Sequence, residues 1–250
     1  LEGRHRRLLV LAGEGREEQA AHAFAYYARM VGRPVRLLFA ADSLEDGSPY
    51  SVFMKAMAEL NLGNVRVESL LYKDSEEILG ATFDGLILDL TEQLRPNDLG
   101  RLVELVAGGG LIAALTPRLE EWEETVTRFH KKLIVPPYGE EDLKHRFIRR
   151  LLKTLRRHPG IWLFEDGRLI HGRPTPPMAE SPESPEPPEG ARFPRQLYRL
   201  TLTQDQVEAL HGFEHLLPRG GGHRVLVLTA NRGRGKSAAL GLGAAGLLNA

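Results

Sequence analysis

Cysteine is absent from the 250-residue sequence, so disulfide bonds and thiolate metal sites are excluded. A chain without disulfides is typical of a reducing compartment. No apolar run reaches the roughly 20 residues that cross a membrane, and no signal peptide precedes the first predicted strand. The 33 basic and 33 acidic side chains cancel, so the net charge identifies no partner. We therefore expect a cytoplasmic protein with no membrane partner.

A phosphate-binding loop is the most specific motif that is present. An apolar run over 223–230 predicts a buried strand, and the sequence NRGRGKS follows it directly. A helix of small and apolar residues is predicted to come next. The pattern G-x-x-x-x-G-K-[ST] is met at Gly235, Lys236 and Ser237, with Ala230 in place of its first glycine. The order strand, loop, helix is the context that this motif requires.

The residue types of this loop fit a nucleoside triphosphate and Mg²⁺. Gly233 and Gly235 let successive backbone N–H groups face a phosphate, close to the positive end of the following helix. Lys236 is expected to reach the β- and γ-phosphates, and the Ser237 hydroxyl to ligate Mg²⁺. The structural alternative is a glycine-rich turn whose lysine faces solvent. We predict ATP or GTP, with Mg²⁺, as the cofactor.

Gln206 lies at the start of another predicted helix, and two interpretations of it remain open. Together with Thr203 it fits a capping box, in which Gln206 only caps the helix. The segment L-T-x-x-Q also resembles the adenine-reading segment of RecD-like helicases, where the amide offers a donor and an acceptor to the base. In the second interpretation Gln206 belongs to the nucleotide site.

The same helix contains a zinc-peptidase pattern, H-x-x-E-H, at His211, Glu214 and His215. Two histidines four residues apart share one face of a helix and could hold zinc. A glycine inside this helix and a proline after it weaken that geometry, and few residues remain to supply another ligand. We expect no zinc.

Strands and amphipathic helices alternate over residues 1–172, which predicts an α/β domain with a mostly parallel sheet and helices on both faces. The strands are expected at 7–12, 34–40, 64–71, 83–90 and 110–117. The helices are expected at 17–31, 51–62, 96–106 and 140–157, and a hairpin at 161–170. A Pro/Glu-rich linker is predicted at 173–190, and the beginning of a P-loop, RecA-like ATPase domain at 191–250.

The predicted helix 140–157 combines an apolar stripe with a basic face. Its apolar side chains are Leu143, Phe147, Ile148, Leu151, Leu152 and Leu155. Acids at its start and arginines at its end suit the helix dipole. The opposite face holds five bases and no acid: Lys144, Arg146, Arg149, Arg150 and Lys153. Such a face is either a solvated surface or a contact with an RNA backbone, which added salt would weaken.

The segment 229–241 resembles the signature loop of the tRNA(Met) cytidine acetyltransferases (TmcA) and their eukaryotic relatives, through its core Arg-Gly-Arg-Gly-Lys-Ser. Residues 83–117, with a glycine turn at 108–110, are similar to the α/β N-terminal domain of that family. Residues 202–206 lie where the family enters its RecD-like ATPase domain. The resemblance implies a parent enzyme that transfers an acetyl group from acetyl-CoA to N4 of a tRNA anticodon cytidine, driven by ATP or GTP hydrolysis.

The resemblance also implies roles for residues of the loop. Triphosphate contacts are implied for four of them: Gly233, Gly235, Lys236 and Ser237. Arg232 and Arg234 are signature residues that could contact phosphate, RNA or the neighbouring acetyltransferase domain. The resemblance gives tRNA as the partner of the parent enzyme and leaves the oligomeric state open.

Four features suggest that the sequence is an N-terminal fragment. It begins without methionine and ends inside a predicted helix, and both the acetyl-CoA-binding domain and the acidic strand that completes a Mg²⁺ site are missing. We expect the chain alone to be inactive as an ATPase and as an acetyltransferase. One alternative is a fragment of a RecD-like helicase or another nucleic-acid motor, and a second is a non-enzymatic α/β module that binds RNA or protein.

Overall fold

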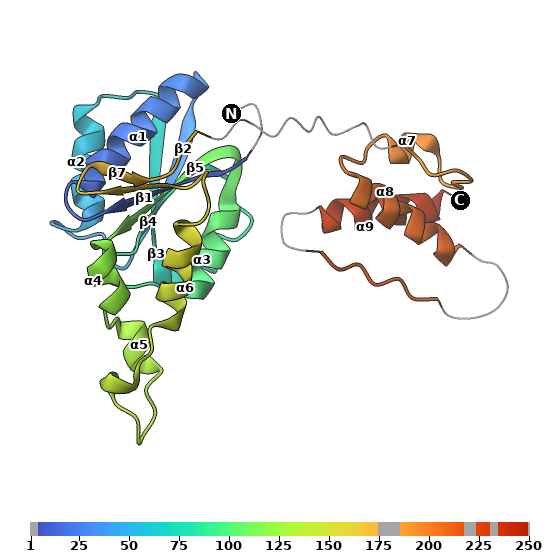
Figure 1. Ribbon diagram of the computed structural model, residues 1–250. Helices are drawn as coiled ribbons and strands as arrows, with labels where there is room; N and C mark the ends of the chain where they lie inside the picture. The colour runs from blue at the N-terminus through green and yellow to red at the C-terminus, as the bar shows by residue number, and fades with distance from the viewer. Residues whose placement is uncertain (1–4, 175–185, 218–223, 231–234, 250) are drawn as a thin grey trace. The chain divides into compact units, whose positions relative to one another are not determined.

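The computed structural model describes residues 5–174, 186–217, 224–230 and 235–249 (Figure 1). The chain divides into two compact units, Leu1–Met178 and Ala179–Ala250, and each is treated by itself. Most of the predicted linker lies outside the described residues. Within the described ranges, no helix is long and apolar enough to cross a membrane.

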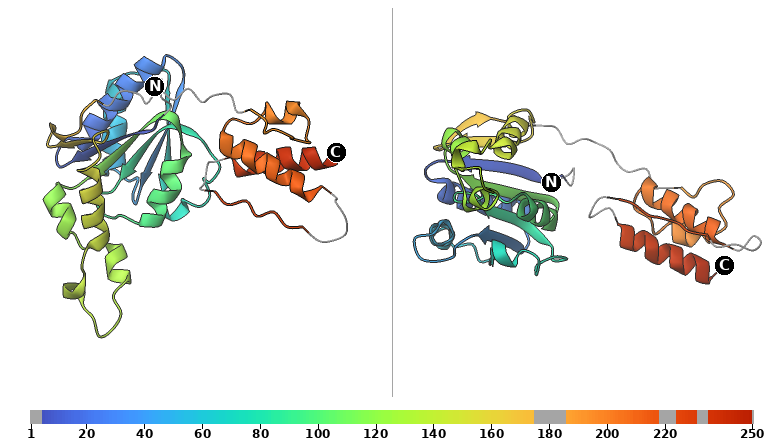
Figure 2. Two further views of the ribbon diagram at one scale, coloured as in Figure 1. Left: turned by 45° about the vertical axis from the view of Figure 1, so that its right-hand side comes forward. Right: turned by 90° about the horizontal axis from the view of Figure 1, so that it is seen from below.

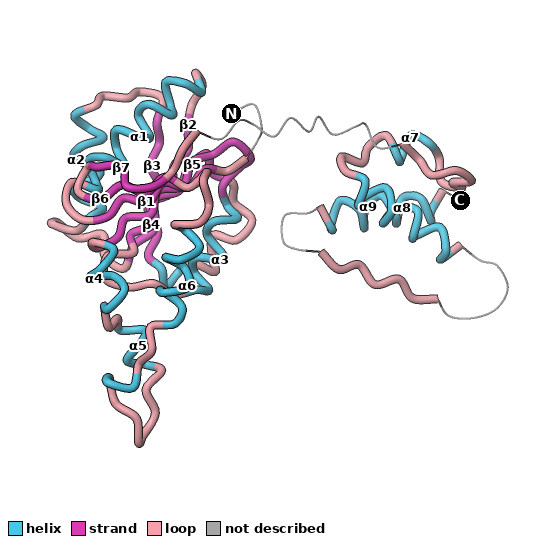
Figure 3. Tube along the Cα trace, in the orientation of Figure 1, coloured by secondary structure: helices cyan, strands magenta, loops and turns pink. Residues whose placement is uncertain are grey.

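The first unit is built on one sheet in the order β3-β2-β4-β5-β1-β6-β7 (Figure 3). All neighbouring strands are parallel except β6 and β7, which form the predicted antiparallel hairpin. The strands are β1 Arg7–Ala12, β2 Val35–Ala41, β3 Val65–Leu71, β4 Phe83–Asp89, β5 Val106–Thr116, β6 Trp162–Glu165 and β7 Arg168–His171. The prediction of a mostly parallel α/β domain is confirmed.

Helices cover both faces of this sheet (Figures 1 and 2). Helices α1 Arg16–Val31 and α2 Pro49–Glu59 pack on one face, over alternate strand residues such as Leu37 and Ile87. Three helices pack on the other face, over Leu38 and Leu88: α3 Pro96–Leu102, α4 Leu119–Glu124 and α6 Arg146–Leu155. Because both faces are covered, central strands are apolar at nearly every position, and β2 is buried everywhere except Arg36.

The helix predicted over 140–157 is wrong at its beginning. Glu140–Asp142 form a separate 3₁₀ turn, and α6 starts only at Arg146, after His145 in the left-handed conformation. The reason is local: the Asp142 carboxylate accepts a hydrogen bond from the Gly139 N–H at 2.9 Å and closes its own turn. The acids therefore do not occupy the first turn of α6, and Lys144 lies outside the helix.

The glycine run 108–110, predicted as a turn, lies inside β5, where the register with β4 shifts. The surroundings of Gly110 show why a residue without a side chain is needed here. A Cβ atom there would overlap the Asp84 carbonyl oxygen on the neighbouring strand. The glycines thus allow two strands to approach closely, as at a β-bulge.

The second unit is a small helical cluster. It contains α7 Arg195–Tyr198, α8 Gln204–Phe213 and α9 Lys236–Leu248. Helices α8 and α9 lie side by side (Figure 2), and their core contains Phe193, Tyr198, Val207, Leu210 and Phe213. The glycines of α9 make this packing close, because a Cβ atom at Gly243 would overlap the Phe213 ring.

The predicted buried strand before the loop is wrong. Residues 224–230 form no strand, and Val225 and Val227 are 84% and 75% exposed. Leu226 and Leu228 pack against the helical core, so the apolar alternation is real but only one side is covered. A strand needs a neighbour for its backbone hydrogen bonds, and the described part of the second unit contains no other strand.

Candidate nucleotide-binding site

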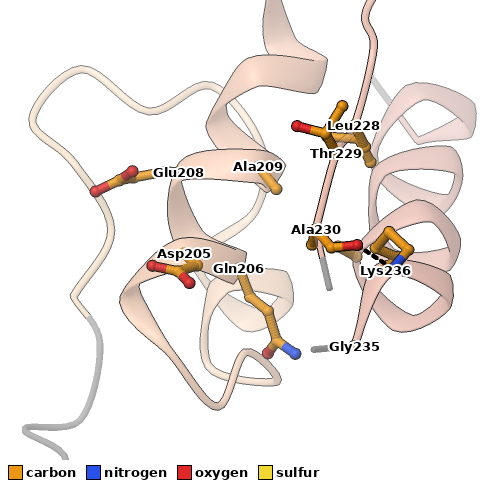
Figure 4. A pocket seen from close by; sticks show the side chains of 10 residues that line it. Asp205, Gln206, Glu208, Ala209, Leu228, Thr229, Ala230, Gly235 and Lys236 are labelled. Atoms are coloured by element: carbon orange, nitrogen blue, oxygen red, sulfur yellow. Dashed lines mark hydrogen bonds between the residues drawn. The ribbon is translucent and has the colours of Figure 1, made fainter. Parts of the chain in front are cut away.

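A cavity of about 280 Å³ lies between α8, residues 228–230 and the start of α9 (Figure 4). Its lining consists of Asp205, Gln206, Glu208, Ala209, Leu228, Thr229, Ala230, Gly235, Lys236 and Ala239. Residues 205–209 of α8 are thus brought to two segments that follow them by about 20 residues or more, 228–230 and 235–239. The predicted residues Arg232, Gly233 and Arg234 lie outside the described residues.

Gly235 is the N-cap of α9, and the position requires glycine for two reasons. Its φ of 78° lies in the left-handed region, which L side chains rarely adopt. A Cβ atom would also overlap the Gln206 amide nitrogen. Among the described residues no side chain caps α9, so the positive end of the helix lines the cavity with its first amides. Such a helix end is suited to an anion.

Lys236 contacts the residue at the first position of the motif, Ala230. Its ammonium donates a hydrogen bond of 2.6 Å to the Ala230 carbonyl oxygen, which closes the interval between the two ends of the motif (Figure 4). Ser237 follows in the first turn of α9, exposed to solvent. Lys236 lines the cavity, whereas Ser237 is not among the lining residues.

Gln206 reaches from α8 towards Gly235. Its amide oxygen accepts a 2.7 Å hydrogen bond from the Leu202 N–H, while its backbone N–H donates to the Thr203 hydroxyl at 3.3 Å. The amide nitrogen faces Gly235, as Figure 4 shows. An adenine contact through both amide atoms would therefore use the second lone pair of the amide oxygen or replace the hydrogen bond from Leu202.

Two acids in the lining were missed by the sequence interpretation. Asp205 and Glu208 lie on exposed positions of α8, and both would repel a triphosphate. Figure 4 shows the Glu208 side chain pointing away from Lys236. Their positions on one helical turn are the only signal that the sequence offered, because the cavity forms by packing of α8 beside the loop.

Glu214 of the zinc-peptidase pattern is a structural carboxylate. It is 2% exposed and accepts hydrogen bonds from the Arg192 N–H, the Phe193 N–H and the Tyr198 hydroxyl, at 2.8, 2.8 and 2.6 Å. Burial alone would raise the pKa of Glu214, but these hydrogen bonds hold it below its usual range. Its oxygens thus tie the segment before α8 to the end of that helix. Among the described residues, no group of three ligands is arranged for a metal.

A second hollow, of about 190 Å³, lies at the carboxyl ends of β2 and β4. Ligands of open α/β sheets bind at such ends, where connections leave towards opposite faces. Asp42 and Asp89 line it, and burial raises the pKa of both carboxyl groups. The Gln93 amide donates to Asp42 at 2.8 Å, and Thr91 donates to Asp89 at 2.6 Å. The carboxylates are therefore engaged within the fold.

The basic residues predicted for RNA do not form one uniform face. The guanidinium of Arg149 lies 3.3 Å from Glu123 and 2.9 Å from Glu124, both on α4. Arg146, Arg150 and Lys153 are exposed on α6, and Lys144 precedes the helix. Helix α6 itself contributes no acid to these bases, but α4 packs beside α6 and brings its carboxylates to Arg149.

Comparison with known proteins places the chain in a family. Residues 1–166 match the family described as "tRNA(Met) cytidine acetyltransferase TmcA, N-terminal". Proteins named tRNA(Met) cytidine acetyltransferase TmcA from Thermococcus kodakarensis and Pyrococcus abyssi are 40% and 38% identical, over 85% and 97% of the chain. The namesake from Methanopyrus kandleri is 37% identical over 97% of it.

The chain spans 27%, 32% and 31% of the length of these three relatives. The family match ends before the second unit, whereas the Pyrococcus and Methanopyrus matches cover nearly the whole chain. By the family match over residues 1–166, and by its identity to these relatives over most of its length, the chain belongs to the tRNA(Met) cytidine acetyltransferase TmcA family.

Proposed function

We propose that the chain is the nucleotide-binding N-terminal part of an ATP-dependent tRNA cytidine N4-acetyltransferase. The complete enzyme would transfer an acetyl group from acetyl-CoA to the anticodon cytidine of a tRNA. Family membership supports the tRNA substrate class, because the relatives are named for tRNA(Met) cytidine acetylation. The transfer itself is assigned to residues beyond this chain.

One observation carries the nucleotide-binding part of the proposal. The N-terminal end of α9, the left-handed Gly235 and the Lys236 ammonium meet at one cavity, in the sequence context of a phosphate-binding loop. Backbone amides at a helix end and a lysine charge are the groups that bind the phosphates of ATP or GTP. Ser237 would supply a hydroxyl ligand to Mg²⁺ that bridges those phosphates.

Lys236 would gain a phosphate partner when a nucleotide binds. Its ammonium now donates to the Ala230 carbonyl, a neutral acceptor. A phosphate oxygen is charged, so it attracts the ammonium by its charge as well as by accepting a hydrogen bond, which a carbonyl oxygen does not. The lysine is thus held at the mouth of the loop by an interaction that a triphosphate can replace. In the complete enzyme, nucleotide hydrolysis would then drive the positioning of the tRNA.

Nucleotide affinity tests this part of the proposal. Binding of a fluorescent ATP analogue with Mg²⁺ is compared between the unmodified chain and Lys236→Ala, with Lys55→Ala on the exposed side of α2 as control. Loss of a charge-assisted hydrogen bond weakens binding by roughly 10-fold or more. Lys55→Ala should leave the affinity unchanged. Equal affinity of Lys236→Ala and the unmodified chain would refute the nucleotide site.

The chemistry is tested with the complete gene product. Radiolabelled acetyl-CoA, tRNA and ATP are supplied together, and acetylated cytidine is measured after digestion of the tRNA. ATP-dependent acetylation supports the proposal. ATP-dependent unwinding of RNA without acetyl transfer would favour a helicase-like motor instead, and RNA binding without either activity would favour a binding module.

A further inference from the structure

The segment from α5 to the turn after α6 has a large excess of basic over acidic residues. Residues 128–158 contain ten lysines and arginines but only three acids, in a chain whose charges cancel overall. This segment comprises α5 Arg128–Lys132, a loop and α6 Arg146–Leu155. Figure 1 shows α5 and its loop projecting from the sheet, with α6 leading back to it. A polyanion could therefore approach this part of the surface.

Four bases of this segment form a single line, which we call the basic stripe: Arg146, Arg150, Lys153 and Arg157. Their spacing of three or four residues places them on one side of α6, about one helical turn apart. Arg157 lies in the turn after the helix and continues the line, with its N–H bonded to the Thr154 carbonyl at 3.1 Å. All four are exposed. The stripe extends over about 16 Å at 1.5 Å per residue.

The stripe is carried on a rigid support. The side of α6 opposite to it holds Ile148, Leu152 and Leu155, which are 1%, 2% and 4% exposed in the main core. The helix cannot rotate without exposing these residues. The bases therefore point away from the sheet in a fixed order, which lowers the entropy that binding would cost.

The stripe differs from Arg149, its neighbour on the same helix. Arg149 turns to α4 and is neutralised by two glutamates. Over the part of the chain that the structure describes, none of the four stripe residues has a carboxylate within ion-pair distance. Binding an external anion would therefore break no internal ion pair of the stripe.

From this geometry we propose that the basic stripe binds the phosphate backbone of RNA. That the RNA is a tRNA rests on the proposed function. That the ligand is an extended polyanion is inferred from the four exposed bases in a line, none of which has an ion pair with another described residue. Neutralised phosphates release counterions, which supplies the binding free energy and makes it dependent on salt. The stripe offers no aromatic side chain and no hydrogen-bond acceptor, so it would position the RNA without reading its sequence.

A membrane surface fits this segment less well than RNA does. The loop after α5 exposes apolar side chains, with Leu133, Val135 and Tyr138 at 57%, 65% and 65%, which lipid could accept. The exposed acids Glu140–Asp142 follow this loop in the sequence and precede the stripe, however. An anionic lipid surface that touched both would also meet these acids. A nucleic-acid strand is narrow and can follow the stripe alone.

Salt dependence gives the expected size of the effect. Four phosphate contacts predict a slope of about −3 to −4 in a plot of log affinity against log salt concentration. Affinity would then fall by about 50- to 150-fold between roughly 50 and 200 mM salt. Removing two contacts should reduce the slope by about 2.

The test measures binding of a tRNA(Met) transcript to the whole 250-residue chain by fluorescence anisotropy at several salt concentrations. Arg150→Glu with Lys153→Glu is compared with the control Arg29→Glu with Lys55→Glu, which changes the net charge equally on exposed positions of α1 and α2. The stripe variant should lose affinity about tenfold or more, and its slope should fall by about 2. The control should retain both. Tryptophan fluorescence confirms folding, because Trp122 and Trp162 are both in the first unit.

Neighbouring arginines supply a finer comparison. Arg150→Ala should weaken tRNA binding more than Arg149→Ala, because only Arg150 is unpaired. Equal losses would overturn the proposal, since net charge rather than the stripe would then control binding. Unchanged binding in the double stripe variant would overturn it too.

Anionic vesicles of phosphatidylserine and phosphatidylcholine separate the membrane from RNA. Stripe-dependent binding to vesicles, with tRNA affinity unaffected by the stripe, would overturn the proposal in favour of a lipid surface. The nucleotide site is tested independently by Lys236→Ala. If the stripe variants bind tRNA normally, the proposal of nucleotide binding is unaffected. If Lys236→Ala binds ATP normally, the proposal of RNA binding by the stripe is unaffected.

Discussion

Replacing Gly235 by alanine should damage both the second unit and its nucleotide site. The left-handed conformation costs an L-residue about 1–2 kcal/mol. The new methyl group would also overlap the Gln206 amide nitrogen and force that side chain away. Gln206 would then lose its hydrogen bond from Leu202, which contributes about 1 kcal/mol. We expect the free energy of unfolding of the second unit to fall by about 2–3 kcal/mol.

The natural control for this change lies further along α9, at Gly241. This residue is exposed, its φ is not positive, and a Cβ atom added to it would meet no other atom within 4 Å. Alanine there should stabilise the helix by about 1 kcal/mol, because alanine has the higher helix propensity. The two substitutions add the same atoms to one helix and are expected to have opposite signs.

Two signals separate the units in this experiment. Both tryptophans belong to the first unit, so their fluorescence in urea reports only that unit. Hydrogen exchange of α8 and α9 amides, followed by mass spectrometry, reports the second. Gly235→Ala should accelerate exchange in α8 and α9, weaken ATP binding and leave the tryptophan transition unchanged. Unaltered exchange and unaltered affinity would refute the reasoning from φ and from the overlap with Gln206.

Three further predictions concern the cores of the units. Glu214→Gln should destabilise the second unit by about 2–4 kcal/mol, since charge-assisted hydrogen bonds are lost, while exposed Glu208→Gln should not. Because the folded pKa of Glu214 is lowered, its stabilisation is complete above the unfolded pKa of about 4.3 and should disappear as pH falls below it, as exchange would show. Leu152→Ala should lower the free energy of unfolding of the first unit by about 2–5 kcal/mol, measured by tryptophan fluorescence. Phe147→Ala, at a half-exposed position, should lower it clearly less. Equal losses would contradict the assigned core.

The strands of the first unit were predictable because their signal is local. The bounds of β1, β2, β3 and β4 agree with the predicted ranges to within a residue, and β1, β2 and β4 are the short apolar runs typical of parallel strands covered on both faces. The apolar run before the loop carried the same signal and gave no strand. Its pattern could not reveal whether a neighbouring strand was present to accept its hydrogen bonds.

The helix predicted over 140–157 shows a second limit. The acids were assigned to the helix dipole, yet Asp142 closes a turn of its own, and the helix begins later at Arg146. A carboxylate in the first turn of a helix and a carboxylate that closes a separate turn both accept hydrogen bonds from backbone N–H groups. Sequence spacing does not decide between them, because they differ in the path of the chain around α5 and not in residue type.

The α/β class, the order of the loop residues and the family could all be read from the amino-acid sequence, because they follow from local patterns of apolar side chains, glycine and lysine. Which charges are available depended instead on tertiary packing. Packing of α4 beside α6 neutralises Arg149 and leaves Arg150 unpaired, and packing of α8 beside the loop brings Gln206 to Gly235. Charge pairing and contact depend on distances between segments remote in sequence, and those distances are fixed only when the cores form.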